Sequence, residues 1–159
     1  MYRAKVITIS DRASSGVYAD ESGPLASGIL RENGFEAGDV LIIPDEEERI
    51  YESLTSIADS GSTDVIFTTG GTGFSKRDVT PEATVRACDR MAPGIAEAVR
   101  AMSLEKTKNA MLSRAVAGIR GETLIINLPG SKNAVRECLE FVLPVLPHGI
   151  GILKGEADG

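Results

Sequence analysis

Short apolar runs alternate along this chain with longer segments whose apolar residues recur at helical spacing. The runs Val6–Ser10, Val40–Ile43, Val65–Thr69 and Leu124–Leu128 have the length and the β-branched content of buried strands. Parallel strands need long crossover connections, and a helical pattern supplies one between successive runs. The alternation therefore predicts a three-layer α/β/α fold with a mostly parallel sheet. The chain has 159 residues and no apparent linker, so residues 1–159 are expected to form one domain.

Proline, glycine and capping residues bound the segments between the strands. Helices are predicted from Pro24 to Gly34, from Glu46 to Ser60, from Thr80 to about Asp89, from Pro93 onward, and after Ser131, with Pro144 and Pro147 stopping or kinking the last one. Asp11–Gly23 is expected to be a loop, and the sequence around His148 predicts a turn. Leu112–Ile119 does not favour one type of element.

Composition narrows the classes of function. The formal charge is −6 and no Lys/Arg cluster is visible, which argues against a nucleic-acid partner. No apolar run approaches the ~18–20 residues that span a bilayer, so no membrane partner is expected and the cytoplasm is the default location. The single His148 and the widely spaced Cys88 and Cys138 argue against a zinc site and against most Ser-His-Asp triads.

Three loops follow predicted strands at their carboxyl ends, where ligands usually bind in α/β folds. They are Ser10–Gly16, Gly70–Asp78 and Leu128–Ser131, and we expect all three to meet at one rim. The candidate ligand-binding residues in and beside them are Ser10, Asp11, Ser15, Gly16, Thr69, Gly70, Gly71, Thr72, Gly73, Pro129, Gly130, Ser131 and Lys132.

The glycine loop, Gly70–Gly73, gives the strongest of these signals. Glycine tolerates positive φ and lets the backbone approach a ligand, and successive N–H groups in such a turn form a concavity for an anion. The hydroxyls of Thr69 and Thr72 add donors. A tight strand-to-helix turn without a ligand is the competing interpretation, and the loop matches neither the P-loop nor the dinucleotide fingerprint.

Two aspartates extend this hypothesis. Asp78 lies between the glycine loop and the next helix, and Asp45 follows the second strand. Mg²⁺ bound with a nucleotide uses one or two carboxylates together with phosphate oxygens, so this pair is the candidate metal site. The structural alternatives are that Asp78 caps the turn before Thr80 and that Asp45 is the N-cap of an acidic helix start.

The weaker loops have similar alternatives. Ser10–Gly16 is small and polar, and it suits either a phosphate or ribose contact or an ordinary loop. Pro129–Ser131 opens a helix whose N-terminus can bind an anion, with Lys132 nearby, but it also fits a normal strand-to-helix turn. The residues alone thus predict a rim for a phosphorylated ligand and Mg²⁺ without specifying a reaction.

Taken together and in this order, the loops resemble those of the molybdopterin adenylyltransferases of molybdenum-cofactor biosynthesis. The resemblance rests on Ser10–Tyr18 with Ser22–Pro24, on Thr69–Gly73 with Arg77–Thr84, and on the later Leu112–Arg114 and Leu128–Lys132. It runs from about residue 4 to about residue 150. Many relatives have a proline shortly after the Leu-Pro-Gly motif, whereas Ser131–Asn133 here looks more like the homologous domain of eukaryotic fusion enzymes, which leaves the subfamily open.

The resemblance implies the three-layer fold, usually as a homotrimer, and a reaction. Adenylyl transfer from ATP to the terminal phosphate of molybdopterin would release pyrophosphate with the assistance of Mg²⁺. Asp45 and Asp78 correspond to the two functional aspartates of the family, as catalytic residues and Mg²⁺ ligands. A partner enzyme would receive the product for metal insertion.

Two other functions fit the same residues. A nucleotide pyrophosphate hydrolase on this fold is one, although Arg77–Pro81 favours the transferase. A non-catalytic carrier or scaffold for molybdopterin is the other, and it would not require Asp45 and Asp78. The apolar stretch Phe141–Leu153 suits either the trimer interface or the core.

Overall fold

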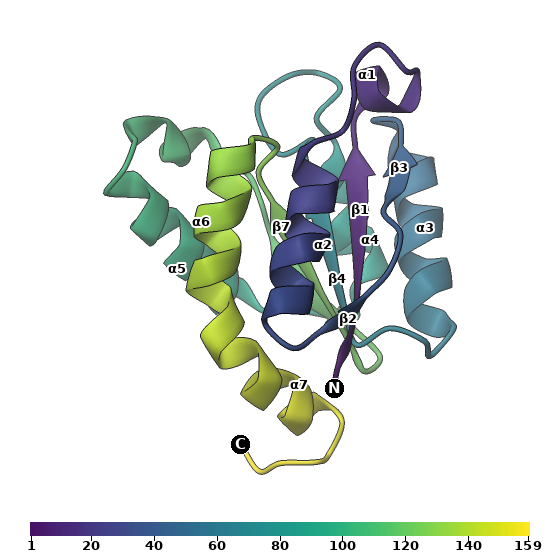
Figure 1. Cartoon of the computed structure of the whole chain (residues 1–159), viewed down its shortest axis with the longest axis vertical. Helices are drawn as coiled ribbons and strands as arrows, with labels where there is room; N and C mark the ends of the chain where they lie inside the picture. Colours follow the sequence, from purple (N-terminus) through teal and green to yellow (C-terminus); the bar gives the residue numbers. More distant parts are fainter.

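A seven-stranded sheet forms the centre of the computed structural model, which describes residues 1–159 (Figure 1). The strands are β1 (Arg3–Ile9), β2 (Glu36–Ala37), β3 (Leu41–Ile43), β4 (Val65–Thr69), β5 (Arg90–Met91), β6 (Ala117–Arg120) and β7 (Thr123–Leu128). Their order is β2-β1-β4-β7-β6-β5, and β3 pairs with β1 on the same parallel edge as β2. Only the β5–β6 and β6–β7 pairs are antiparallel, so the predicted mostly parallel sheet is confirmed.

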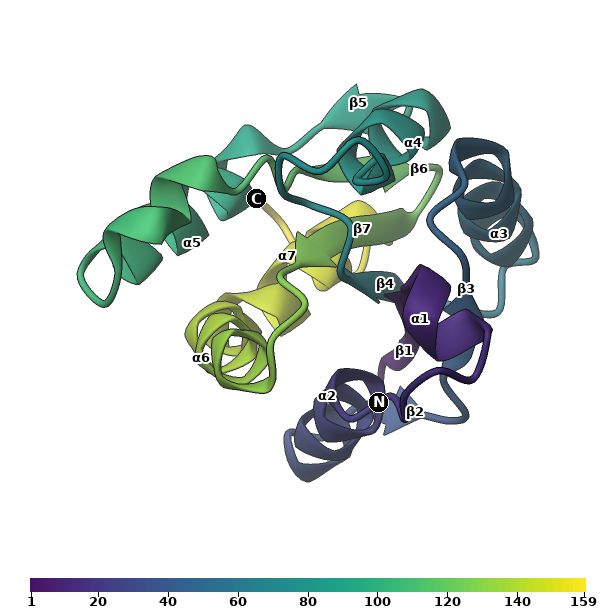
Figure 2. The same cartoon turned by 90° about the horizontal axis from the view of Figure 1, so that it is seen from above.

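Helices cover both faces of this sheet (Figure 2). They are α1 (Asp11–Ser14), α2 (Ser22–Glu32), α3 (Glu47–Asp59), α4 (Thr80–Ala87), α5 (Pro93–Leu104), α6 (Lys132–Val142) and α7 (Leu146–Leu153), with short 3-10 turns η1 (Lys108–Leu112) and η2 (Leu143–Val145). Side chains of α2, α5, α6 and α7 pack on one face, and those of α3 and α4 pack on the other. The three predicted layers are therefore present.

Alternation along the central strands divides the core in two. In β4, Val65 and Phe67 face the layer of α2 and α6, while Ile66 faces α3 and α4. The same split separates Ile125 from Ile126 in β7. Successive side chains of a strand point to opposite faces, so runs that are apolar throughout are what a sheet covered on both sides requires.

Most predicted elements are confirmed, and the differences are local. The expected loop Asp11–Gly23 contains the one-turn helix α1, and the helix expected to reach Asp89 ends at Ala87. Cys88 is already extended at φ −86° and ψ 140°, which leads the chain into the short strand β5. The ambiguous segment Leu112–Ile119 divides between η1, a connecting stretch and the start of β6.

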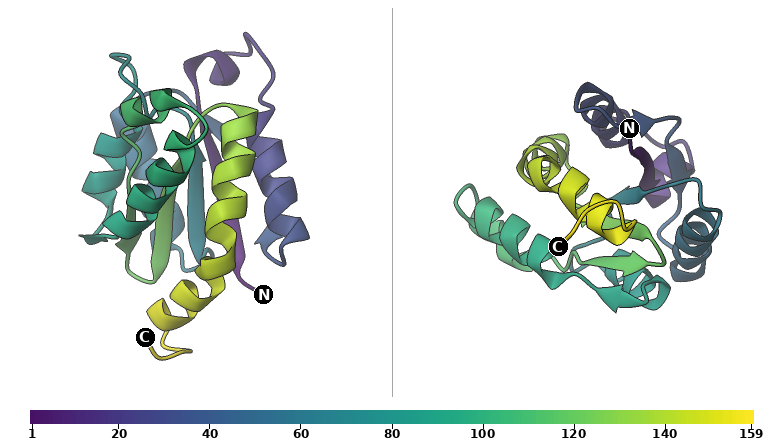
Figure 3. Two further views of the ribbon diagram at one scale, coloured as in Figure 1. Left: turned by 90° about the vertical axis from the view of Figure 1, so that its left-hand side faces the viewer. Right: turned by 90° about the horizontal axis from the view of Figure 1, so that it is seen from below.

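The C-terminal region bends as its prolines predict. α6 ends at Val142, and a short 3-10 turn leads into α7, so the chain kinks and then continues as a helix. His148 lies within α7, and the predicted turn around it is wrong. Both termini lie at the end of the molecule opposite to the loops that follow β1, β4 and β7 (Figure 3). None of the helices combines the length and the apolarity that crossing a membrane would require.

Candidate active site

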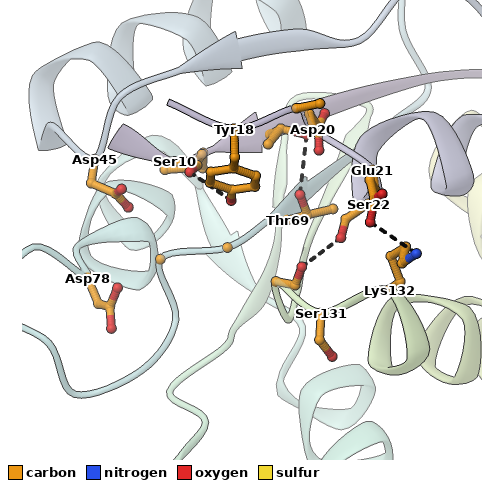
Figure 4. A pocket seen from close by; sticks show the side chains of 16 residues that line it. Ser10, Tyr18, Asp20, Glu21, Ser22, Asp45, Thr69, Asp78, Ser131 and Lys132 are labelled. Carbon is orange, nitrogen blue, oxygen red and sulfur yellow. Dashed lines mark hydrogen bonds and ion pairs between the residues drawn. The ribbon is translucent and has the colours of Figure 1, made fainter. Parts of the chain in front are cut away.

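A pocket of about 420 Å³ opens at the carboxyl ends of β1, β4 and β7, and we call it the polar pocket. Its sixteen lining residues include members of all three loops that the sequence predicts to meet, together with Asp45 and residues of the segment before α2 (Figure 4). The predicted residues that line it are Ser10, Asp45, Thr69, Gly70, Gly71, Asp78, Gly130, Ser131 and Lys132. Asp45 and Asp78 lie at one side of the pocket, and Ser131 and Lys132 lie at the other (Figure 4).

The remaining predicted residues lie elsewhere. Ser15 and Gly16 are exposed at the end of α1 and line no major cavity. Asp11 does not line the polar pocket, but it is hydrogen-bonded to Asp45, which does. Thr72, Gly73 and Pro129 border a second cavity of about 490 Å³. The glycine loop thus separates two cavities, and its residues divide between them.

The second cavity, which we call the apolar cavity, lies between the glycine loop and the helices α5 and α6. Twelve of its 22 lining residues are hydrophobic, against three of sixteen in the polar pocket. Ile95 and Val99 of α5 supply apolar wall, while Ser103, Ser113 and Asn127 add polar groups. The two cavities are therefore suited to different parts of a ligand.

Backbone conformation explains the glycines between the cavities. Gly70 and Gly71 have φ values of 93° and 70°, which side-chain-bearing residues rarely adopt. A Cβ at Gly70 would collide with the carbonyl oxygen of Ile9, so only glycine fits the close approach of β1 and β4. The backbone N–H groups of Gly71, Gly130 and Ser131 donate no hydrogen bond within the chain. They remain available to an anion, whereas the N–H of Gly70 already donates to the carbonyl of Leu128 at 3.2 Å.

Asp45 is held by the first loop and does not cap a helix. Its Oδ2 accepts a hydrogen bond of 2.8 Å from the backbone N–H of Asp11, and its own N–H donates to Oδ1 of Asp11 at 3.0 Å. The N-cap of α3 is Glu46, and no side chain caps this helix, so the capping alternative is wrong. Burial raises the pKa of Asp45, and the negative charges of Asp11 and Asp78 raise it further.

Asp78 lies on the other side of the glycine loop. A Cβ at Gly71 would lie 3.0 Å from Oδ1 of Asp45, and one at Gly73 would lie 3.0 Å from Oδ2 of Asp78. Oδ2 of Asp78 accepts a bond of 3.0 Å from the N–H of Ser75, so the carboxylate closes the turn that precedes Thr80, as the structural alternative expected. The N–H of Thr80 donates to the carbonyl of Gly71.

Arg77 does not face the polar pocket as a free phosphate ligand. Its guanidinium forms two hydrogen bonds with Asp11, at 3.0 and 2.9 Å. This contact lowers the pKa of Asp11. The network Arg77–Asp11–Asp45 therefore joins three strand-end loops and fixes Asp45, which gives Asp11 a positioning role where the sequence predicted ligand contact.

The segment before α2 supplies pocket residues that sequence reasoning did not assign to the site. Asp20 accepts hydrogen bonds from the Thr8 hydroxyl at 2.7 Å and from the N–H of Gly23 at 3.1 Å. The Ser22 hydroxyl donates to the carbonyl of Gly130 at 2.7 Å. Tyr18 contacts the Ser10 hydroxyl at 3.1 Å. Their position just before a helix that follows a strand-end loop is the signal that could have identified them.

Charge in the polar pocket is strongly unbalanced. Asp20, Glu21, Asp45 and Asp78 contribute carboxylates, and Lys132 is the one basic residue in the lining. Lys132 is itself paired with Glu21 at 3.0 Å. The chain has no cluster of three or more side chains of the metal-ligating types. A phosphorylated ligand must therefore bring cations with it, because the pocket supplies little positive charge of its own.

Comparisons with known proteins agree with this geometry. Residues 5–148 match the family described as a probable molybdopterin binding domain. The chain is 45% identical over 153 residues to the molybdopterin adenylyltransferase of Helicobacter pylori, covering 94% of this chain and 86% of that protein. It is 43% identical over 155 residues to the corresponding Escherichia coli protein, covering 93% and 79%. The crystal structure of the molybdopterin biosynthesis enzyme MoaB from Thermus thermophilus has a TM-score of 0.91 at 45% identity, covering 98% of both chains.

Proposed function

Because the chain belongs to the molybdopterin-binding domain family, we propose that it is a molybdopterin adenylyltransferase of molybdenum cofactor biosynthesis. It transfers AMP from ATP to the terminal phosphate of molybdopterin and releases pyrophosphate. The observation that carries the proposal is the arrangement of Asp45 and Asp78 on either side of a glycine loop with free backbone N–H groups.

The carboxylates of the polar pocket fit Mg²⁺. Asp45 and Asp78 each use Oδ2 to accept a hydrogen bond, and Oδ1 of each has no donor within the chain. Mg²⁺ is bound through one or two carboxylates plus substrate phosphates, and Asp45 and Asp78 would supply these two carboxylates. When bound there, Mg²⁺ would neutralise phosphate charge during the transfer. The raised pKa of Asp45 reflects a carboxylate that would gain from a nearby cation.

The proposed reaction requires no covalent bond between the protein and its substrates. An oxygen of the terminal phosphate of molybdopterin forms a bond to the α-phosphorus of ATP, and the bond from that phosphorus to the α–β bridging oxygen breaks. Pyrophosphate leaves with the electron pair. The nucleophile is already anionic, so no strong general base is required, and the chain contributes positioning and electrostatic stabilisation. The amides of Gly71, Gly130 and Ser131 hold phosphate oxygens.

The two cavities divide the substrates. The polar pocket, with its free amides and carboxylates, takes the phosphates that react. The apolar cavity takes the pterin ring, whose flat faces match its hydrophobic wall and whose polar edge matches Ser113 and Asn127. The glycine loop lies between the ring and the phosphates of the same substrate.

Assembly and location complete the proposal. We expect a homotrimer in the cytoplasm that hands adenylylated molybdopterin to a metal-insertion enzyme. Val142, Leu146 and Ile150 of the C-terminal region are buried in the monomer core, whereas Phe141 and Val145 are exposed and remain candidates for a subunit contact.

The test follows label from α-labelled ATP with purified protein, molybdopterin and Mg²⁺. Label on the pterin with an equal amount of pyrophosphate is the expected result. Hydrolysis of ATP without pterin labelling would instead indicate a nucleotide hydrolase. Tight molybdopterin binding with intact ATP would indicate a carrier. Asp45→Ala and Asp78→Ala should each abolish label transfer while leaving the protein folded.

A further inference from the structure

Arg114 lies behind the glycine loop and lines neither of the two cavities. It belongs to the Leu112–Arg114 block, in which the proposed function uses Ser113 but gives Arg114 no role. Its backbone N–H donates a hydrogen bond of 2.8 Å to the carbonyl of Thr72. The residue is therefore attached to the loop before its side chain is considered.

The guanidinium of Arg114 holds both ends of the segment Gly73–Asp78. Nε donates to the carbonyl of Gly73 at 2.8 Å, and Nη2 donates to the carbonyl of Asp78 at 2.6 Å. Nη1 and Nη2 also donate to the carboxylate of Glu82 at 2.6 and 3.2 Å. All three nitrogens are used, and the pair with Glu82 fixes the guanidinium against α4.

The segment closed by Arg114 carries the Asp78 carboxylate. Within it, the N–H of Asp78 donates to the carbonyl of Ser75 at 2.9 Å, and the N–H of Ser75 donates to Oδ2 of Asp78 at 3.0 Å. These two bonds form a compact turn but do not attach it to the sheet. The other side-chain contact that attaches this segment to the rest of the protein is the ion pair between Arg77 and Asp11, which is exposed to solvent.

Arg114 bonds to neither side-chain oxygen of Asp78, and Oδ1 of this carboxylate has no donor within the chain. Its guanidinium bonds to main-chain carbonyls near Asp78, while Glu82 neutralises its charge. The hydrogen bond to Glu82 raises the pKa of Arg114, and the same bond lowers the pKa of Glu82, so both groups remain charged.

We propose that Arg114 is a positioning residue for adenylyl transfer, which fixes Asp78 against the glycine loop without touching either substrate. The inference rests on the proposed function, in which Asp78 is catalytic. A displacement of about 1 Å at a reacting group can lower a rate about 10²-fold. Lysine cannot replace the arginine, because one ammonium group does not span two carbonyls and a carboxylate as the planar fork does.

Arg120 provides a matched control. Its guanidinium donates two hydrogen bonds of 2.9 Å to Asp59 and one of 2.9 Å to the carbonyl of Ala87. None of these three residues lines either cavity. Arg114→Ala and Arg120→Ala each remove a guanidinium that bonds to a carboxylate and to main-chain carbonyl oxygen. We expect comparable changes in thermal midpoint, but only Arg114→Ala should lower kcat, by about 10²-fold, with KM for ATP changed less than about threefold. Arg114→Lys should recover less than about a tenth of the lost rate.

A double-mutant cycle tests whether Arg114 acts through Asp78. In single-turnover label transfer, Arg114→Ala introduced into Asp78→Asn should cost less than about threefold further, because the carboxylate that it positions is already gone. A further loss near 10²-fold would overturn the proposal.

Hydrogen exchange tests the positioning role of Arg114 without an activity measurement. Amides of residues 72–79 should exchange about tenfold faster in Arg114→Ala than in the parent, and at the parent rate in Arg120→Ala. Unchanged exchange in Arg114→Ala would overturn the positioning role. Failure of the parent to transfer label would instead contradict the proposed function, so the two failures are distinguishable.

Discussion

Two aspartates at opposite ends of the sheet show how the protein uses the same side chain in two ways. Asp64 precedes β4 at its amino end and is 3% exposed. Its carboxylate accepts bonds from the N–H and guanidinium of Arg3 at 2.7 and 3.1 Å and from Lys154 at 2.8 Å. Asp45 follows β3 at the carboxyl end, where its charged neighbours are Asp11, Asp78 and Arg77, and Arg77 is itself paired with Asp11.

The pKa values move in opposite directions for this reason. Burial by itself would raise the pKa of Asp64, but the bonds from Arg3 and Lys154 outweigh it and hold that pKa far below the usual range. Burial also raises the pKa of Asp45, and the neighbouring carboxylates add to the rise. The amino end is thus electrostatically complete within the chain, whereas on the proposed function the carboxyl end would be completed by a ligand and its cation.

The largest expected effect is on catalysis at the carboxyl end. Asp45→Asn and Asp78→Asn should each lower label transfer by about 10³-fold, because each removes a negative charge that would hold the cation neutralising the phosphates in the transition state. The urea midpoint should not fall by more than a few tenths of a molar, since neither carboxylate has a cationic partner of its own. A large loss of stability in Asp45→Asn would contradict the contrast with Asp64.

At the amino end the expected effect is on stability. Asp64→Asn should lower the free energy of unfolding by about 3 kcal/mol, because it leaves Arg3 and Lys154 without their shared carboxylate. Urea denaturation measures this, and Asp59→Asn is the control, since its exposed pair with Arg120 should be worth less than about 1 kcal/mol. Label transfer per folded molecule should stay within about twofold of the parent.

The pH dependence of stability should separate the two ends by sign. Asp64 has a lowered pKa in the folded state, so its stabilisation is complete above the unfolded value of about 4 and is lost as pH falls. Asp45 has a raised pKa, so its contribution declines as pH rises through the folded-state value. Below about pH 5, Asp64→Asn should flatten the rise in stability with pH, and above about pH 4, Asp45→Asn should remove a decline in stability with pH. Urea titrations at stepped pH measure both slopes, and equal slopes would remove the distinction.

The smallest expected effect concerns the one basic residue in the polar pocket. Glu21→Gln should lower KM for ATP by about twofold, because it frees Lys132 from an exposed ion pair that is worth less than about 1 kcal/mol. Lys132→Gln should raise KM instead. If both variants behave like the parent, Lys132 does not contact the phosphates.

Local signals explain which parts of the fold the sequence predicts. β4 is predicted to the residue, because an unbroken apolar and β-branched run ends abruptly at Gly70. β2 and β5 have two residues each, which is too short for any periodicity, and they form only by pairing with β1 and β6. Their existence depends on contacts that no local pattern records.

The candidate site follows the same division. The rule that ligands bind beyond the carboxyl ends of strands brings Asp45, Asp78 and the glycine loop to one rim, and the structure agrees. The sequence does not indicate that Asp45 bonds to Asp11 and not to α3, because this contact joins two loops that are distant in sequence. It also does not indicate that Thr72 and Gly73 face the apolar cavity, since this depends on the path of the backbone through the loop.

The most direct test of the account compares the two ends in one assay. Single-turnover transfer of label from ATP to molybdopterin is measured for the parent, Asp78→Asn and Asp64→Asn under conditions in which all three are folded. We predict a loss of about 10³-fold for Asp78→Asn and less than about twofold for Asp64→Asn. Equal rates for Asp78→Asn and the parent would contradict the claim that transfer takes place at the carboxyl-end rim.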